Sequence, residues 1–248
     1  LNGPLVATSG NSEGDPIEHE VSSSQRNLAE IADLWLHHDR EIVHPIDDSV
    51  VRVLGNRPVT IRLGRGLGPL SIDLEALRPA GAAAAPPMLA VGGQIKSAIA
   101  ISGRNQAVLG PHIGELEGAT TRERWINHVA ELCQLYGVEP EFLVCDQHPG
   151  YFTTDWVRHR KLPHESVQHH HAHIAAAMVE HQWLDREVLG FAFDGTGYGP
   201  DGMVWGGEVL KATAEDFKRV ANLRPMRLAG GESAIRQPWR VAIELVHE

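Results

Sequence analysis

Cysteine is scarce in this chain of 248 residues, which contains only Cys133 and Cys145. Neither belongs to a Cys-x-x-Cys pair, so a cysteine zinc finger and a disulfide framework are both excluded. No apolar run approaches the ~20 residues of a membrane helix. The start also lacks the basic-then-apolar pattern of a secretory signal. We therefore expect a cytoplasmic protein without a membrane partner, in which both cysteines are buried free thiols.

Basic side chains are outnumbered. The chain has 22 lysines and arginines against 32 acidic residues, a formal net charge of −10. This balance argues against a protein that binds nucleic acid through its overall charge. A local site for a phosphate group is still possible. Apolar residues make up 42% of the chain and charged residues 22%. That composition is typical of a folded protein with one large domain or two small ones.

The segment 79–87, PAGAAAAPP, is the best candidate for a linker. Small residues between prolines neither fill a core nor favour regular structure. We expect domains at 1–78 and 88–248 on either side of it. Residue 1 is Leu rather than Met, and the last segment ends in a helical pattern without a closing strand. The interpretation is a first unit that lacks its beginning and a second domain that is incomplete at its C-terminal end.

Hydrophobic periodicity predicts an α/β protein. Helices are expected at 25–37, at 120–136 with a Thr120–Glu123 capping box and a Gly137 stop, at 151–160 and at 172–183. Strands are expected at 50–54, 88–91, 95–101, 106–109, 142–145, 166–168 and 188–193, with a further hairpin strand at 203–210. The 88–91 and 95–101 strands would form a hairpin around Gly92 and Gly93. Three strands followed by alternating helices and strands indicate a mixed sheet covered by helices.

Histidine is abundant, with 15 copies, and the run Gln168-His169-His170-His171-Ala172-His173 is the strongest local signal. If a helix begins near His170, His169 and His173 stand about one turn apart on the same face. Two imidazoles at this spacing can share a metal ion. His170 with His173 is the competing pair. The alternative is a solvated histidine patch, or histidines that cap a helix.

Asp194 is the natural third ligand. It follows the apolar strand 189–193 and opens the turn Asp-Gly-Thr-Gly. Sheet enzymes bind ligands beyond the carboxyl ends of their strands. The same turn suits a phosphate, because Gly195 and Gly197 let backbone N–H groups approach anionic oxygens and Thr196 adds a hydroxyl. The alternative is an ordinary hairpin turn.

Two further residues are weaker candidates. Lys96 follows the glycine turn Gly92-Gly93 and could hold a nucleotide phosphate, although most such turns are only hairpins. His148 follows the end of the 142–145 strand and is either a proton carrier or a residue that holds the turn. The sequence contains no P-loop, GxGxxG or Ser-His-Asp order.

Taken together, these motifs resemble the HypF family of hydrogenase maturation carbamoyltransferases. The resemblance to the family's YrdC-like domain rests on PLVATSGNSEGDPI (4–17) and LWLHHDREIVHPIDDSVVR (34–52). The resemblance to its following domain rests on MLAVGGQIKSAIAI (88–101), GPHIGELE (110–117), CDQHPGYFTT (145–154), VQHHHAHIAAAMVEH (167–181), FAFDGTGYGPDGMVWGGE (193–208) and GGESAIRQPW (230–239).

The resemblance implies a partial YrdC-like α/β unit followed by a mixed-sheet domain of the actin/sugar-kinase (ribonuclease-H-like) fold. It implies a carbamoyltransferase that uses carbamoyl phosphate and ATP through carbamoyl-adenylate. The acceptor would be the C-terminal cysteine of HypE, for the cyanide ligand of [NiFe] hydrogenase. A divalent metal, iron or zinc, would be held by His169, His173 and Asp194. The implied nucleotide-binding residues are Thr8, Ser9, Asn11, Ser49, Arg52, Lys96, Gly195, Thr196 and Gly197.

The chain departs from the family pattern. The acylphosphatase domain, the cysteine zinc fingers and a further Asp metal ligand are absent from this sequence, and 61–69 carries leucines where the family has Arg and Tyr. We therefore expect weak metal binding and poor turnover by this chain alone. Alternative functions are a small-molecule O-carbamoyltransferase or a relative of the transfer RNA threonylcarbamoyl transferases, and a non-catalytic metal- or nucleotide-binding fragment. The net charge argues against an RNA acceptor.

Overall fold

A computed structural model of the chain describes residues 3–12, 15–77, 83–103, 105–231 and 233–247. The chain divides into two compact units. The first unit comprises 1–76, 83–145 and 150–165, and the second comprises 77–82, 146–149 and 166–248. Within the described ranges, no helix is both long and apolar enough to cross a membrane.

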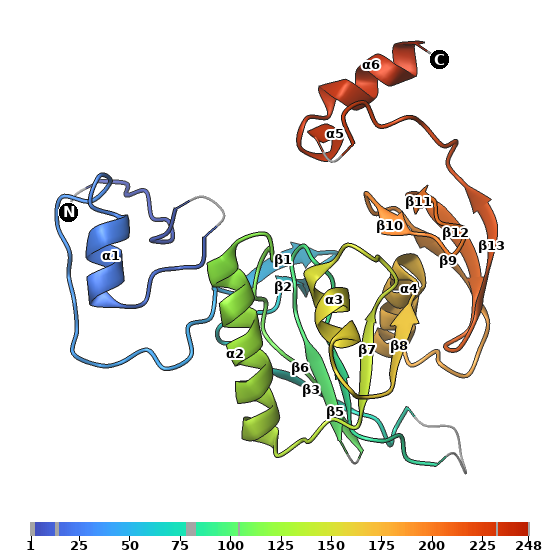
Figure 1. Cartoon of the computed structure of the whole chain (residues 1–248), viewed down its shortest axis with the longest axis horizontal. Coiled ribbons are helices and arrows are strands. Elements are labelled where there is room, and N and C mark those ends of the chain that lie inside the picture. Colours follow the sequence, from blue (N-terminus) through green and yellow to red (C-terminus); the bar gives the residue numbers. More distant parts are fainter. Residues whose placement is uncertain (1–2, 13–14, 78–82, 104, 232, 248) are drawn as a thin grey trace. The chain divides into compact units, whose positions relative to one another are not determined.

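Helices and strands alternate over residues 119–192, and runs of consecutive strands precede and follow that stretch (Figure 1). The helices are α1 (Val21–Asn27), α2 (Ala119–Tyr136), α3 (Phe152–Arg158), α4 (His169–Glu180), α5 (Ser233–Arg236) and α6 (Trp239–His247). The first strands are β1 (Val50–Leu54), β2 (Arg57–Arg62), β3 (Leu70–Asp73), β4 (Met88–Ala90), β5 (Ala100–Gly103), β6 (Gln106–Leu109), β7 (Phe142–Asp146) and β8 (His164–Val167). The remaining strands are β9 (Val188–Ala192), β10 (Gly197–Tyr198), β11 (Val204–Trp205), β12 (Glu208–Ala212) and β13 (Phe217–Asn222).

The largest sheet has six strands in the order β3-β6-β5-β4-β7-β8. Strand β4 pairs antiparallel with β5 and parallel with β7, so the sheet is mixed, as the sequence predicts. Strand β3 precedes the predicted linker and pairs with β6. Residues 79–82 of that linker lie outside the described residues, and 83–87 have no regular secondary structure. The division into 1–78, 79–87 and 88–248 therefore stays a prediction.

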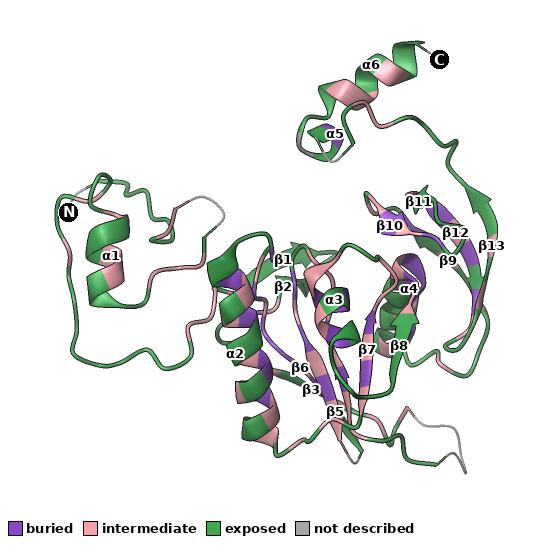
Figure 2. Cartoon of the chain, viewed as in Figure 1, coloured by how far each residue is buried: buried purple, intermediate pink, exposed green. Residues whose placement is uncertain are grey.

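The core of the first unit lies between α2 and the strands, where Figure 2 shows the buried residues gathered. Trp125 is fully buried on α2, and its ring makes edge contacts with the rings of Phe152 and Trp156 at centroid distances of 5.6 and 5.1 Å. The helix ends at Gly137, whose φ of 61° is the left-handed conformation that a glycine adopts without strain. This confirms the predicted stop.

The second unit is built on the three-stranded sheet β13-β12-β9, against which α4 packs. Ile174 and Met178 on α4 form a buried cluster with Leu210 on β12. Gly190 on β9 allows this close approach, because a Cβ there would lie only 2.4 Å from the side chain of Ile174. The helix that carries the histidine run is thus fixed on its sheet by apolar packing.

The helix predicted at 25–37 is wrong, since α1 spans only Val21–Asn27. The apolar stripe that motivated it, Leu28, Ile31, Ala32, Trp35 and Leu36, does not enter a core, since Ile31 is 72% exposed, Leu36 is 101% exposed and the other three are only half-buried. Most helices in proteins are stabilised by packing of an apolar face rather than by propensity. Without a surface to pack on, periodicity alone does not fix a helix here.

Two other local predictions are corrected. Helix α2 begins after Gly118, which is its N-cap without a side-chain cap, so Thr120 lies inside the helix and no capping box forms. Strand β5 begins at Ala100 rather than at residue 95. The residues before it form a loop in which Gly92 and Lys96 have φ of 71° and 51°, values that an extended strand does not allow.

We expect Trp125→Ala to lower the free energy of unfolding by about 3–5 kcal/mol, because it leaves a large cavity in the core of the first unit. Leu135→Ala on the same helix is the control. Leu135 is 71% exposed, so its truncation should change the free energy by no more than about 0.5 kcal/mol. Urea denaturation followed by circular dichroism measures both, and equal effects would contradict the assigned core.

Candidate metal centre

The histidine run opens helix α4. Gln168 is the N-cap, with extended backbone, and its side chain accepts a hydrogen bond from the N–H of His171. His169 is therefore the first helical residue and His173 follows one turn later on the same face. Their Nε2 atoms are 3.3 Å apart. The spacing of the two imidazoles agrees with the geometry expected from the sequence.

Asp194 lies two residues beyond the end of β9 and faces this pair. Its Oδ2 atom is 3.1 Å from Nε2 of His169 and 3.5 Å from Nε2 of His173. One ligand atom from each of the three residues lies within 4.8 Å of the others, which makes them a candidate metal-binding group among the described residues. His170, the competing partner in the sequence analysis, has its Nε2 atom 3.0 Å from the other oxygen of Asp194.

The residues of this group fit a divalent cation. Both carboxylate oxygens of Asp194 are buried and have no aligned hydrogen-bond partner within the described part of the chain. A buried charged oxygen in this state is costly unless a cation or a donor compensates it. Two imidazole nitrogens and one carboxylate oxygen form a donor set typical of zinc and of non-haem iron.

Burial, hydrogen bonds and neighbouring charges shift the pKa values of all three residues. The hydrogen bond to Asp146, with a further contribution from Asp194, raises the pKa of His169 to about 9. Burial opposes ionisation of Asp194, but the imidazoles of His169 and His170 outweigh it and hold the pKa of Asp194 well below its usual range. Burial, reinforced by the charge of His169, lowers the pKa of His173. The carboxylate is thus ionised and His173 is neutral, as metal ligands must be, whereas His169 is protonated at neutral pH and would have to release a proton when a cation binds.

Asp146 belongs to the site although the sequence analysis did not identify it. Its Oδ2 atom is 2.7 Å from Nδ1 of His169, and its Oδ1 accepts the backbone N–H of His148 at 2.8 Å. Its side chain is only 8% exposed. This is the arrangement in which a carboxylate orients a metal-binding histidine. The available signal was its position, because Asp146 ends β7 much as Asp194 follows β9.

The other predicted residues of the second unit lie around this group. The ring of His148 contacts that of Tyr198, with the centroids 5.6 Å apart. In the turn after Asp194, Gly195 is exposed, Thr196 is half-buried and Gly197 is buried. Proton transfer by His148 and phosphate binding by the turn remain predictions.

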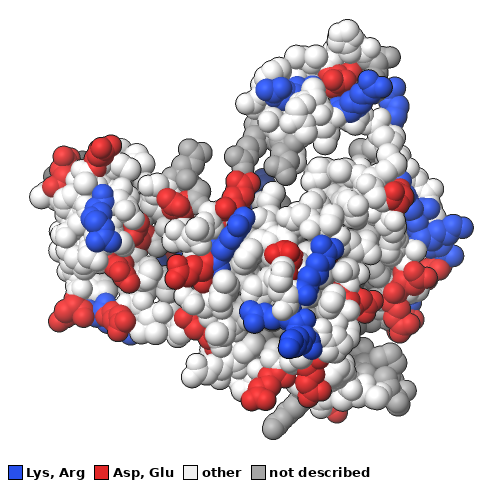
Figure 3. Space-filling view, viewed as in Figure 1, with Lys and Arg blue, Asp and Glu red and all other residues white. Residues whose placement is uncertain are grey.

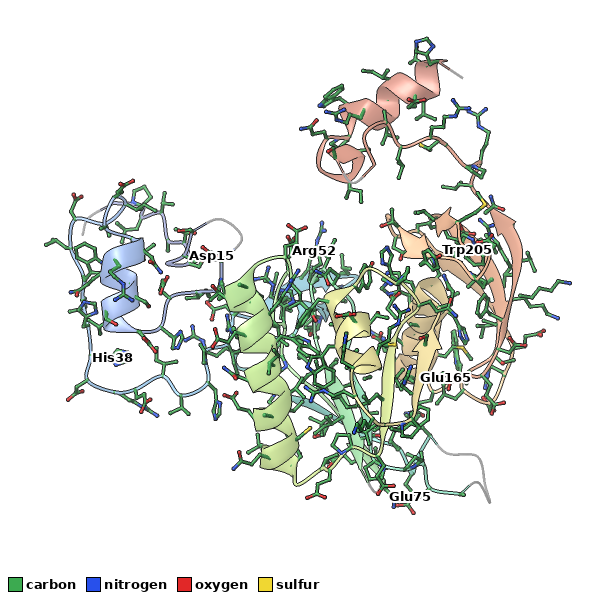
Figure 4. The ribbon with its side chains drawn as sticks, viewed as in Figure 1. Asp15, His38, Arg52, Glu75, Glu165 and Trp205 are labelled. Atoms are coloured by element: carbon green, nitrogen blue, oxygen red, sulfur yellow. The ribbon has the colours of Figure 1, made fainter. Side chains whose placement is uncertain are left out.

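The predicted nucleotide-binding residues of the first unit are mostly exposed. Arg52 lies on β1 and is labelled in Figure 4. Thr8 and Ser9 are exposed in a segment without regular structure, and Lys96 is exposed in the loop between β4 and β5. Exposure leaves their side chains accessible to a ligand, and their role stays a prediction.

Asn11 and Ser49 have structural partners. The amide of Asn11 donates to the carbonyls of Ser12 and Asp15, each at 3.0 Å. The hydroxyl of Ser49 donates to the carbonyl of Arg65 and accepts the N–H of Gly64. These hydrogen bonds hold the local backbone, so a nucleotide would compete with the backbone for the side chains of Asn11 and Ser49.

Three family models match successive parts of the chain. Residues 1–64 match the Sua5/YciO/YrdC model, described as telomere recombination. Residues 83–180 match the HypF Kae1-like domain, and 190–248 match the second subdomain of the carbamoyltransferase Kae1-like domain. The chain therefore combines a YrdC-like portion with a Kae1-like carbamoyltransferase domain, as the sequence analysis expects.

Two curated proteins are similar to this chain along nearly all of its length. Carbamoyltransferase HypF of Synechocystis sp. is 43% identical over 246 residues, which are 99% of this chain and 31% of that protein. The probable carbamoyltransferase HypF of Methanocaldococcus jannaschii is 30% identical over 251 residues, 98% of this chain and 32% of that protein.

Two solved structures of HypF are also similar to this chain. A crystal structure of full-length HypF in the phosphate- and nucleotide-bound form has a TM-score of 0.89 at 38% identity, and covers 96% of this chain and 37% of that one. HypF of T. kodakarensis has a TM-score of 0.83 at 30% identity, covering 96% and 31%. The chain belongs to the HypF family, and it spans about a third of the length of these relatives.

Gly197→Ala is expected to disturb the site. A Cβ at Gly197 would lie 2.5 Å from Cε1 of His170 and 2.9 Å from Cβ of His169, so one of these groups must move. We expect a loss of about 1–3 kcal/mol in the free energy of unfolding, as for other overpacked positions. Gly195→Ala serves as a stability control, because its Cβ would meet nothing within 4 Å. Chemical denaturation of both variants tests this, and equal stabilities would contradict the packing.

Proposed function

We propose that this chain carries the metal-binding part of a carbamoyltransferase of [NiFe]-hydrogenase maturation. The carbamoyl group would pass from carbamoyl-adenylate, made from carbamoyl phosphate and ATP, to the C-terminal cysteine of HypE. The observation that carries the proposal is the convergence of His169, His173 and Asp194, with ligand atoms within 4.8 Å, in a chain of the HypF family. The nucleotide and phosphate in a related HypF crystal structure support the choice of substrates.

The transfer is an acyl substitution. The cysteine sulfur bonds to the carbamoyl carbon, the bond from that carbon to the adenylate oxygen breaks, and AMP leaves with the electron pair. The thiol proton passes to a base. His148 is our candidate for that base, since it lies in the turn that follows Asp146 beside Tyr198. A divalent ion in the site, iron or zinc, would supply Lewis acidity toward a carbonyl or phosphate oxygen.

The protein's own groups would prepare the site. His169, His173 and Asp194 would hold the ion, and Asp146 would fix the ring of His169 so that Nε2 faces Asp194. The Gly195–Gly197 turn would offer backbone N–H groups to the phosphate of the adenylate. Three protein ligands leave coordination positions open, as catalytic sites require.

A second candidate is metal and nucleotide binding without turnover. It is favoured by the candidate ligand group itself, which could hold an ion without any reaction taking place. An RNA acceptor is less well supported. On the face drawn in Figure 3, basic side chains stand among acidic ones, and the net charge of the chain is −10. Affinity for RNA depends on neutralising its phosphates with basic groups.

We expect the purified chain to bind about one zinc or iron ion, and His169→Ala with His173→Ala to abolish binding, because both nitrogen ligands are lost. Inductively coupled plasma mass spectrometry after dialysis against each metal measures the content. His159→Ala with His164→Ala is the matched control, since both are exposed histidines of the first unit. Unchanged metal content in the His169/His173 variant would show that the proposed site does not bind the metal.

We also expect the isolated chain to carbamoylate a peptide that ends in cysteine far more slowly than a full-length HypF relative does. The reason is that the sequence lacks the further Asp ligand that the family resemblance implies, so the ion would be held by one ligand fewer and would dissociate more readily. Mass spectrometry of the peptide, with carbamoyl phosphate and ATP supplied, measures the transfer. Transfer by the 248-residue chain at the full-length rate would show that the expectation of poor turnover is wrong.

A further inference from the structure

The amide of Gln168 has a fixed orientation, although amide oxygen and nitrogen atoms are often ambiguous. Its Oε1 accepts the backbone N–H of His171 at 2.9 Å, and its Nε2 donates to the carbonyl of Tyr198 at 3.3 Å. A backbone N–H only donates and a carbonyl only accepts, so a flipped amide would lose both bonds. The side chain is 1% exposed, and water cannot readily replace them.

This orientation determines the tautomer of His170. The NH₂ group of Gln168 faces Nδ1 of His170 at 2.9 Å. An amide NH₂ has no acceptor, so Nδ1 must present its lone pair. A neutral imidazole with a free Nδ1 carries its proton on Nε2. The ring is fully buried, at 0% exposure, and lies beside the ring of Trp205, which is labelled in Figure 4.

The proton on Nε2 of His170 faces Asp194. The Nε2 atom is 3.0 Å from Oδ1 of Asp194, while Oδ2 of the same carboxylate faces His169 and His173. The N–H does not point directly along the line to Oδ1, so the contact is a close electrostatic one rather than an aligned hydrogen bond. The two oxygens of the carboxylate are nevertheless divided between two sets of partners.

We propose that Gln168 and His170 are positioning residues of the metal centre, with Gln168 fixing the His170 tautomer and His170 reserving Oδ1 of Asp194 so that Oδ2 alone is left for the cation. This inference rests on the proposed function, because it assumes that the cation binds at His169, His173 and Asp194. A carboxylate that binds through one oxygen keeps a further coordination position open for substrate. The N-cap of α4 and the metal ligand after β9 are thereby coupled through one buried ring.

The tautomer can be measured directly on the metal-free wild-type chain, so the result does not depend on whether a variant folds. Long-range ¹H–¹⁵N correlation spectra distinguish protonated from unprotonated ring nitrogens. We expect His170 to be protonated at Nε2 and unprotonated at Nδ1. A proton on Nδ1 would overturn the proposal, whatever the metal content of the protein.

Gln168→Glu tests whether Gln168 sets this state. The glutamate still accepts the N–H of His171 and keeps the shape, but it presents an acceptor to Nδ1 in place of a donor. We expect Nδ1 of His170 to become protonated in this variant. If Nδ1 stays unprotonated in the folded variant, Gln168 does not control the tautomer and the proposal fails.

His170→Leu and His170→Gln form a matched pair for metal affinity. The leucine removes the donor, whereas the glutamine amide keeps one near Oδ1 of Asp194. Competition with a chromophoric chelator for Zn²⁺ should show a loss of about 10- to 100-fold for leucine, as for other groups that orient metal ligands. Glutamine should retain most of the affinity. Equal affinities of the two folded variants would overturn the role of His170.

The His169→Ala, His173→Ala variant separates the two proposals. If it binds Zn²⁺ as tightly as the wild type, the proposed metal site is wrong. If it loses Zn²⁺ while His170→Leu binds like the wild type, the site stands and only the positioning role is overturned.

Discussion

The carboxylate of Asp194 is the group around which the polar residues of the second unit are arranged. Its oxygens are buried, and an ionised carboxylate out of water costs several kcal/mol unless other charges or donors compensate it. Three imidazoles, from His169, His170 and His173, approach it within 3.5 Å. Gly197 leaves room for the ring of His170. The turn after β9 and the first turn of α4 therefore stabilise each other, since each supplies the polar partners for the buried groups of the other.

The histidines of the run have different partners because each successive side chain in a helix is rotated by about 100°. His169 and His173 share the face toward Oδ2 of Asp194, and His170 points to its Oδ1. His171 points elsewhere, and its Nε2–H donates to the carbonyl of Thr213 at 2.9 Å. That bond ties α4 to the turn after β12. Adjacent identical residues thus divide into candidate metal ligands, a proposed positioning group and a structural donor.

The sequence allowed the mixed sheet, the start of α4 near its histidines and the three-residue site to be predicted, because each depends on local period or on strand ends. It did not reveal the partner of a side chain. Asp146 is 23 positions before His169, and only the position of β7 beside β8, the strand that leads into α4, brings that strand end to the site. The orientation of the Gln168 amide was equally out of reach, since it depends on Tyr198 and His171 at once. The helix predicted at 25–37 was wrong for the opposite reason. Its apolar residues have helical spacing, but they do not pack on a surface that would bury them.

The candidate site lies within one compact unit. Asp146, Gln168, His169, His170, His173 and Asp194 all belong to the second unit, as do Tyr198 and Thr213, which anchor the arrangement. Every contact invoked for metal binding is therefore internal to that unit. The predicted nucleotide-binding residues Thr8, Ser9, Asn11, Ser49, Arg52 and Lys96 belong to the first unit. It follows that substitutions of these predicted residues in the first unit should leave the three candidate metal ligands in place.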